Sequence, residues 1–154
     1  MSLEEKVALK LIDKNKTLCV AESCSGGLLS HRLTNIPGSS RFLKCTVIAY
    51  SNDAKEKILK IPQDLMKKYG AVSEEVAVKM AQNIRKLFQT DFGISITGIA
   101  GPTGATKSKP IGLVFVALST PEETLCLKCQ FKGTRESIKS QSTTQALELL
   151  LEFL

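Results

Sequence analysis

Short apolar runs alternate with helical segments along this chain, and this alternation limits its fold more than any other feature. Strands are expected over 17–21, 42–50, 92–97, 111–119 and 124–131. Helices are expected over 3–14, from 28 onward, and over 52–60, 62–70, 73–89 and 134–153. Strands separated by helices favour parallel crossovers, and the short connection 120–123 favours an antiparallel hairpin. The order therefore predicts an α/β fold, a three-layer α/β/α sandwich with a mixed, mostly parallel sheet.

The length and composition are typical of one globular domain, which we expect to span residues 1–154. Hydrophobic residues make up 43% of the chain and charged residues 23%, so it can bury a core. No apolar run approaches the ~18 residues of a membrane span, and the start Met-Ser-Leu-Glu-Glu-Lys is too acidic for a signal peptide. The odd number of cysteines, 5, favours reduced thiols. We therefore expect a cytoplasmic protein that is not bound to a membrane.

The net charge of +6 suggests a polyanion as partner, but the pattern of charge argues against nucleic acid. Lysines are spread along the chain and interleaved with acidic residues, and aromatic residues make up only 5%. Proteins that bind nucleic acid usually concentrate basic and aromatic residues. Nucleic-acid binding is therefore disfavoured, and a small anionic ligand could use the same charge locally.

Histidine and cysteine residues predict no metal site. His31 is the only histidine, and we expect it on a helix surface. Cys126 and Cys129 have the spacing of half a metal site, but they lie in an expected strand, where residues three apart point to opposite faces. A histidine triad is equally disfavoured, so a nucleophilic hydrolase of this sequence would pair serine with lysine.

Small and polar residues gather where three of the strands should end, at 22–27, 50–55 and 97–104. Ligands of such sheets usually bind at these ends. Ser23 stands at a strand-to-helix turn, as does the nucleophile of hydrolase elbows, although the pattern is not G-x-S-x-G. A plain turn in which Ser25 caps the next helix is the alternative. The long loop from Gly98 to Pro110 contains glycines that permit close approach to a ligand.

Tyr50 and Lys55 lie on either side of the second strand-to-helix junction. If Ser51 or Asn52 caps the helix, Lys55 falls in the first turn, where the helix dipole opposes a positive charge. That position lowers the pKa of the amine and suits a general base. A solvated lysine with no role in chemistry is the alternative.

Five segments occur in a fixed order, namely 21–27, 37–40, 50–55, 70–74 and 97–102. Together they resemble the CinA C-terminal domain family of competence/damage-inducible proteins, over about residues 3–153. The resemblance implies hydrolysis of the carboxamide of nicotinamide mononucleotide (NMN) to nicotinic acid mononucleotide and ammonia. It also implies a Ser/Lys mechanism without metal or other cofactor, a small-molecule nucleotide as partner, and a homodimer.

The resemblance carries over to individual residues by position. The catalytic candidates are Ser23, Ser40, Tyr50 and Lys55. The matching substrate-binding candidates are Thr97 and Arg135, of which Arg135 would bind the phosphate. Ser25, Gly26, Gly27 and Gly98 are further binding candidates, because their small-residue turns offer backbone N–H groups to an anion. Two serines stay open as the nucleophile, because Ser23 fits the elbow argument and Ser40, in a Gly-Ser-Ser turn, could reach the same pocket.

The chain departs from the family pattern at two places. Cys45-Thr46 stands where relatives usually have a Gly-Gly pair, and the loop 102–107 has fewer glycines than usual. Both changes could alter the shape of the pocket, but neither removes a catalytic candidate. A non-catalytic nucleotide-binding or regulatory module is the alternative function.

Overall fold

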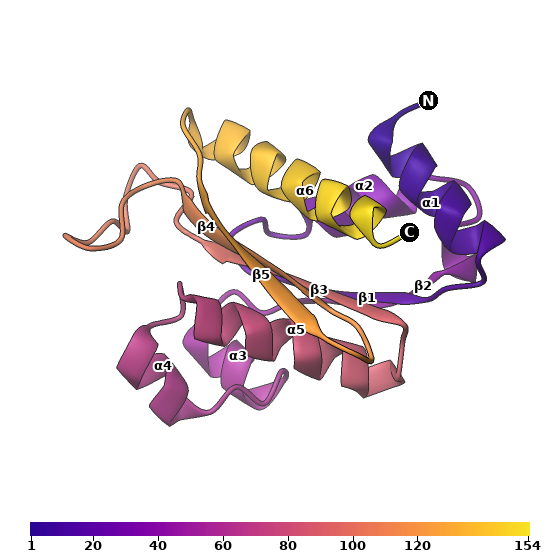
Figure 1. Ribbon diagram of the computed structural model, residues 1–154. Helices are drawn as coiled ribbons and strands as arrows, with labels where there is room; N and C mark the ends of the chain where they lie inside the picture. The colour runs from indigo at the N-terminus through magenta and orange to yellow at the C-terminus, as the bar shows by residue number, and fades with distance from the viewer.

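The computed structural model describes residues 1–154 as one five-stranded sheet between two layers of helices (Figure 1). This arrangement confirms the predicted three-layer sandwich. The strands are β1 (Leu18–Glu22), β2 (Leu43–Ile48), β3 (Phe92–Gly98), β4 (Leu113–Ser119) and β5 (Thr124–Gln130). The helices are α1 (Leu3–Asp13), α2 (Leu28–Thr34), α3 (Asn52–Lys57), α4 (Gln63–Tyr69), α5 (Glu74–Phe88) and α6 (Arg135–Glu152), with a 3-10 turn at Ser39–Arg41.

The sheet is mixed, as expected, with the strand order β2-β1-β3-β4-β5. β1 pairs in parallel with β2 and β3, whereas β3, β4 and β5 pair antiparallel. The register places Glu22 opposite Ile48 on one side and Ile96 on the other. Because β1, β2 and β3 run in the same direction, their carboxyl ends meet at one edge of the sheet. The segments that follow these three strands are therefore neighbours.

Helices cover both faces of the sheet (Figure 1). α1, α2 and α6 form one layer, and α3, α4 and α5 form the other. Every residue of β1 and β4 is buried, and β3 is buried up to Thr97. A strand covered on both faces reads as a continuous apolar run, which is why these strands show little alternation in the sequence.

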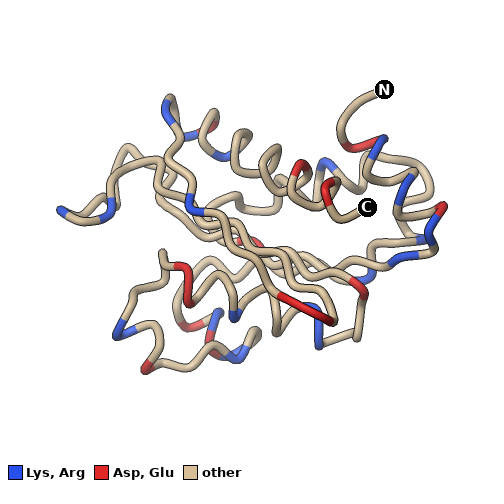
Figure 2. The backbone as a smooth tube through the Cα atoms, viewed as in Figure 1, with Lys and Arg blue, Asp and Glu red and all other residues tan.

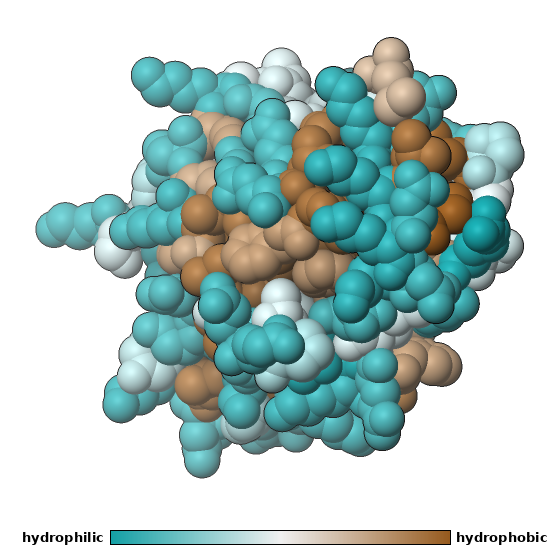
Figure 3. All heavy atoms as spheres, turned by 45° about the vertical axis from the view of Figure 1, so that its right-hand side comes forward, coloured by the Kyte–Doolittle hydropathy of each residue, from teal (hydrophilic) through white to brown (hydrophobic).

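The edge strands differ from the central ones. β2 and β5 contain no fully buried residue and mix half-buried with exposed positions, because an edge strand is covered less completely than a central one. Cys126 packs in the cluster beneath α5, and Cys129 packs against the core beneath α6. The prediction that these two thiols point to opposite faces is confirmed. Figure 3 shows a face that is largely hydrophilic, with an apolar region at mid-height between the helical layers.

Hydroxyl caps begin three of the helices where the sequence places them. The side chains of Ser51, Ser73 and Thr134 accept hydrogen bonds from the first turns of α3, α5 and α6. Each satisfies an N–H group that the helix leaves without an internal partner. Lys55 therefore lies at the end of the first turn of α3, as predicted from a cap at Ser51.

α2 is capped in a different way from the one expected. Gly27 is its N-cap residue and makes no side-chain bond. Instead the buried carboxylate of Glu22 accepts hydrogen bonds from the N–H groups of Leu29 at 3.0 Å and Ser30 at 2.9 Å. The interpretation of Ser25 as the helix cap is wrong, because the Glu22 side chain reaches the helix first. His31 lies exposed on this helix, as predicted. No helix in the structure combines the length and apolarity needed to cross a membrane.

Candidate active site

A cavity of about 290 Å³ opens at the carboxyl edge of the parallel strands. This volume is near the lower end of the range of small-molecule sites, about 300–1,000 Å³. The cavity is lined by Ser23, Cys24, Tyr50, Asn52, Lys55, Ala71, Val72, Thr97, Gly98, Ile99, Ala100, Gly101, Thr103, Gly104 and Arg135. All three strand ends singled out in the sequence therefore contribute to one site.

Ser23 and Lys55 form the closest pair of reactive groups in this cavity. Lys55 Nζ donates a hydrogen bond to Ser23 Oγ at 2.8 Å, and a second to the carbonyl of Ala49 at 2.9 Å. The N–H of Ser23 bonds the carbonyl of Ile96 at 2.9 Å, which fixes the serine at the sheet edge. A nucleophile and a base within hydrogen-bond distance are the minimal requirement for serine activation by lysine.

Burial favours the neutral amine of Lys55, which is the form that can act as a base. Its side chain is only 2% exposed, and no carboxylate forms an ion pair with it. Removal from water disfavours the ammonium form and lowers the pKa of Lys55. The alternative of a solvated lysine is therefore wrong. The neighbouring Cys24 is also buried, and desolvation raises the pKa of its thiol to about 12. Cys24 is thus a neutral thiol and a poor nucleophile at neutral pH.

The third strand end forms the opposite wall. Thr97 Oγ1 donates to the carbonyl of Ala71 at 2.9 Å and ties the segment before α5 to β3. Gly98 lines the cavity where β3 lies close to β4. A Cβ atom at Gly98 would lie 2.6 Å from Cγ2 of Val114 and 2.8 Å from the carbonyl of Leu113. Glycine is therefore required at this position by the close approach of the two strands.

Arg135 and Tyr50 stand at the mouth of the cavity. Arg135 donates one bond to the Tyr50 hydroxyl at 2.9 Å and another to the carbonyl of Gly101 at 2.7 Å. Tyr50 is 60% exposed and Arg135 is also exposed. The guanidinium thus connects the end of β2 with the loop after β3. It has five N–H donors, so others are free for a ligand.

The turn after Ser23 offers backbone donors. The N–H groups of Cys24, Ser25 and Gly27 donate to no backbone carbonyl. Gly26 and Gly27 have φ angles of 60° and 97°, in the region that favours glycine. Free N–H groups in a left-handed turn form a common anion-binding arrangement. Ser25, Gly26 and Gly27 do not line the cavity itself, and the buried hydroxyl of Ser25 has no hydrogen-bond partner.

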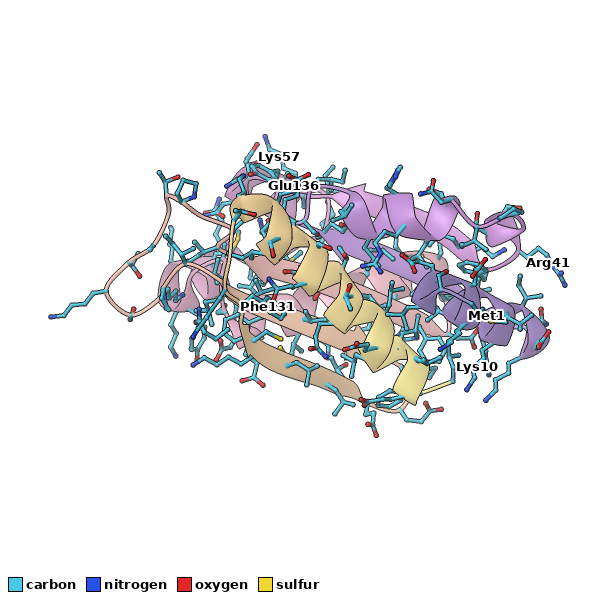
Figure 4. All side chains as sticks on the ribbon, turned by 90° about the horizontal axis from the view of Figure 1, so that it is seen from above. Met1, Lys10, Arg41, Lys57, Phe131 and Glu136 are labelled. Carbon is cyan, nitrogen blue, oxygen red and sulfur yellow. The ribbon has the colours of Figure 1, made fainter.

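Ser40 is not brought to this site. It lies exposed in the 3-10 turn that precedes β2, whereas Ala49 and Tyr50 follow that strand. The six residues of β2 separate the two ends by about 20 Å. Figure 4 shows Arg41, which follows Ser40, at the end of the molecule opposite Lys57 and Glu136. The expectation that Ser40 reaches the same pocket within one chain is corrected: it lies at the amino edge of the sheet.

Several lining residues were missed in the sequence. Asn52 begins α3 three residues before Lys55, and Thr103 lies in the long loop after β3. Asn52 and Thr103 lie within the segments 50–55 and 97–104, which the sequence marks as strand ends with small and polar residues. Their position in these segments was the signal that could have identified them. Ala71 and Val72 belong to segment 70–74, which carries part of the family resemblance, but they were not named as candidates; the Thr97 bond to Ala71 holds this segment at the cavity.

The remaining charge does not form a second site. Figure 2 shows Lys and Arg distributed over all layers and interleaved with acidic residues. No three His, Cys, Asp or Glu side chains come together in an arrangement that could hold a metal ion. The convergent polar groups of the molecule are those at the carboxyl edge of the sheet.

Comparisons with known proteins agree with this fold. A family model described as the CinA C-terminal domain matches residues 1–154. A CinA-like protein of Syntrophotalea carbinolica is 48% identical over 153 residues, which cover 99% of this chain and 37% of that protein. The chain spans about 37% of the length of most of the curated relatives it matches.

Solved structures are similar over nearly their whole length. The competence/damage inducible protein CihA from Agrobacterium tumefaciens has a TM-score of 0.95 at 32% identity, with 97% of this chain and 92% of that chain covered. The competence damage-inducible protein A from Klebsiella pneumoniae has a TM-score of 0.94 at 31% identity, with 97% and 93% covered.

Proposed function

This chain belongs to the CinA C-terminal domain family, and we propose that it hydrolyses the carboxamide of NMN to nicotinic acid mononucleotide and ammonia. The proposal rests on the resemblance for the substrate and on the site for the chemistry. The observation that supports it best is the 2.8 Å contact between Lys55 Nζ and Ser23 Oγ in a buried environment. We also propose that residues 1–154 form a single domain and that the partner of this domain is a small nucleotide.

In the proposed reaction Ser23 is the nucleophile and Lys55 the general base. The neutral amine of Lys55 takes the hydroxyl proton as Ser23 Oγ attacks the carboxamide carbon. The resulting ammonium gives that proton to the leaving nitrogen when the C–N bond breaks, so that ammonia departs and an acyl-serine remains. Water then attacks the ester with Lys55 as base again, and Ser23 is released together with the carboxylate product.

The negative charge that develops on the carboxamide oxygen needs donors near Ser23. The free N–H of Cys24 supports this role, because it belongs to the residue directly after the nucleophile. Hydrolase elbows use the N–H at the same relative position. Backbone donors fixed before the reaction stabilise an oxyanion without reorganisation. Cys24 acts here through its backbone, and its neutral thiol takes no part.

The phosphate of NMN fits the mouth of the cavity better than its floor. The floor holds the buried Ser23 and Lys55, whereas Arg135 and Tyr50 are exposed at the rim. A doubly charged phosphate keeps part of its hydration at the rim and pairs there with the guanidinium. This orientation brings the carboxamide to the reactive pair.

An ammonia-release assay with matched serine variants tests the proposal. We expect wild-type protein to release ammonia from NMN, and Ser23→Ala and Lys55→Met each to lose about a thousandfold or more of that rate. Ser40→Ala is the matched control, and it should keep the rate within about twofold because Ser40 lies at the other edge of the sheet. Circular dichroism and thermal melting should show that all variants are folded.

Two results would reject the proposal in different ways. If wild-type protein binds NMN but releases no ammonia, the chain is a nucleotide-binding or regulatory module. If Lys55→Met releases ammonia at nearly the wild-type rate, the enzyme acts without the Ser/Lys pair.

The family resemblance also supports a homodimer. Both β2 and β5 are edge strands, each with one side free of a neighbouring strand. Such an edge can pair with a second copy. Sedimentation velocity should give the mass of two chains, and a monomer at micromolar concentration would contradict this part.

A further inference from the structure

Lys139 is a basic side chain near the site that the mechanism above does not use. It lies in α6, one turn after Arg135, and residues four apart in a helix have Cβ atoms about 5–6 Å apart on the same face. Its side chain is half-buried. α6 thus presents two cations from adjacent turns on the side where Arg135 lines the cavity.

The position of Lys139 is fixed by the turn after Ser23. Lys139 Nζ lies 3.5 Å from where a Cβ atom on Gly26 would be, so the ammonium stands directly over this exposed glycine. None of the three ion pairs of the molecule includes Lys139, and its amine takes part in no side-chain hydrogen bond. A lysine that is half-buried and unpaired beside a backbone turn differs from the solvated lysines elsewhere on the surface.

Backbone N–H groups without a backbone acceptor occur both in the turn beneath this ammonium and at the start of α6. The N–H groups of Ser25 and Gly27, on either side of Gly26, have no backbone acceptor. The N–H groups of Arg135 and Glu136, in the first turn of α6, also lack one. Free N–H groups together with Arg and Lys side chains form the usual environment of a bound phosphate. The nearest acid on the helix, Glu136, does not pair with Lys139.

The structure assigns Lys139 as a substrate-binding residue that, with Arg135, holds the phosphomonoester of the nucleotide above Gly26. This inference rests on the proposed function for the identity of the substrate. It makes Lys139 a specificity residue, which selects the phosphorylated nucleotide over the corresponding nucleoside. Lys139 does not touch the reacting atoms, so its removal should act on KM more than on kcat.

Kinetics on two substrates test this role. We expect Lys139→Met to raise KM for NMN about tenfold, with kcat within about twofold of wild type. For nicotinamide riboside, which lacks the phosphate, the effect on kcat/KM should be much smaller than for NMN. Lys139→Glu should weaken NMN further by repulsion, and Lys139→Arg should recover most of the affinity. Lys132→Met removes an exposed lysine that precedes α6, and this matched control should leave both substrates unaffected.

A binding measurement separates this inference from the proposed reaction. Calorimetric titration with ribose 5-phosphate should show binding to wild type and to Lys132→Met, and about tenfold weaker binding to Lys139→Met. Ribose without phosphate should not distinguish the three proteins. If wild-type protein releases no ammonia but this pattern holds, the reaction is wrong and the phosphate site stands. Equal affinity of wild type and Lys139→Met for ribose 5-phosphate, or no binding to wild type, would overturn the assignment.

Discussion

Lys55 Nζ lies 2.8 Å from Ser23 Oγ although the two residues are 32 positions apart in the chain. The contact forms because β1 and β2 are parallel neighbours, so that the turn after β1 meets the helix after β2. Lys55 is held from the other side by the carbonyl of Ala49, the residue directly after β2. The base is therefore anchored to the same sheet edge as the nucleophile.

The pH dependence of turnover should follow the protonation of Lys55. The reaction needs the neutral amine, and burial lowers the pKa of Lys55 below that of free lysine. kcat/KM for NMN should therefore rise with pH and level off at a lower pH than a solvent-exposed lysine would give. Initial rates of ammonia release between pH 6 and pH 10 would measure this, roughly spanning the range in which a buried lysine titrates. A rate that stays flat over that range would show that Lys55 is not the base.

The stability of the protein should also depend on the protonation of Lys55. Below the lowered pKa, Lys55 is charged in the folded and unfolded states, and folding must desolvate the charge. Above the pKa of free lysine the amine is neutral in both states and this penalty is absent. The unfolded state binds more protons in the window between the two values, so stability rises with pH across it.

A variant without this charge isolates the effect. Lys55→Met removes the ammonium and fills similar space with apolar atoms. Its free energy of unfolding should exceed that of wild type at neutral pH, and the difference should shrink as the pH rises through the window. Urea titrations of both proteins at several pH values would measure the difference. A constant difference would mean that the buried amine of Lys55 does not titrate in that range.

Arg135 and Tyr50 should behave as a coupled pair. The guanidinium donates to the Tyr50 hydroxyl at 2.9 Å and to the Gly101 carbonyl at 2.7 Å. We expect Tyr50→Phe to weaken NMN binding only a few-fold, and Arg135→Met to raise KM about tenfold or more, because Arg135 also binds the phosphate. In the double variant the two effects should not add, since both remove the same bond. Additive effects on KM would indicate that the two residues contact the substrate independently.

Ser25 offers a change that should not impair the fold. Its hydroxyl is fully buried and has no hydrogen-bond partner, which leaves a polar group desolvated without compensation. Ser25→Ala should stabilise the protein by up to about 1 kcal/mol, since a buried unsatisfied polar group costs on the order of 1–3 kcal/mol. Thermal unfolding of wild type and Ser25→Ala would show the sign. A loss of stability would mean that the hydroxyl has a partner, such as an ordered water.

Most of the fold was predictable because its signals are local. The caps at Ser51, Ser73 and Thr134 are set by residues within one turn, and the buried strands are marked by apolar runs. The Glu22 carboxylate was not recognised as the cap of α2, because it acts seven residues ahead, on Leu29. That distance is outside the short-range pattern by which a capping residue is found.

The candidate site was predictable where it depends on strand ends, and not where it depends on neighbouring elements. Ser23, Tyr50, Lys55 and Thr97 follow or end strands, so the topology brings them together. Ser40 was misplaced because the family resemblance was followed there, although the expected strand over 42–50 already puts residue 40 at the amino edge of the sheet. Lys139 was not identified from the sequence because its position over Gly26 depends on how α6 packs against the turn after β1. No local sequence pattern indicates this packing.

Because β1, β2 and β3 are parallel, the molecule has a reactive end at the carboxyl edge of the sheet and an opposite end that can be modified. Every residue that we assign to chemistry or binding lies at or just after the carboxyl end of a strand, or on α6 beside it. The amino end, with the loop between α1 and β1 and the turn around Arg41, holds none of these residues. A fluorescent label or surface attachment at that end would leave the reactive end facing solvent, so the protein can be immobilised in a known orientation without blocking its pocket.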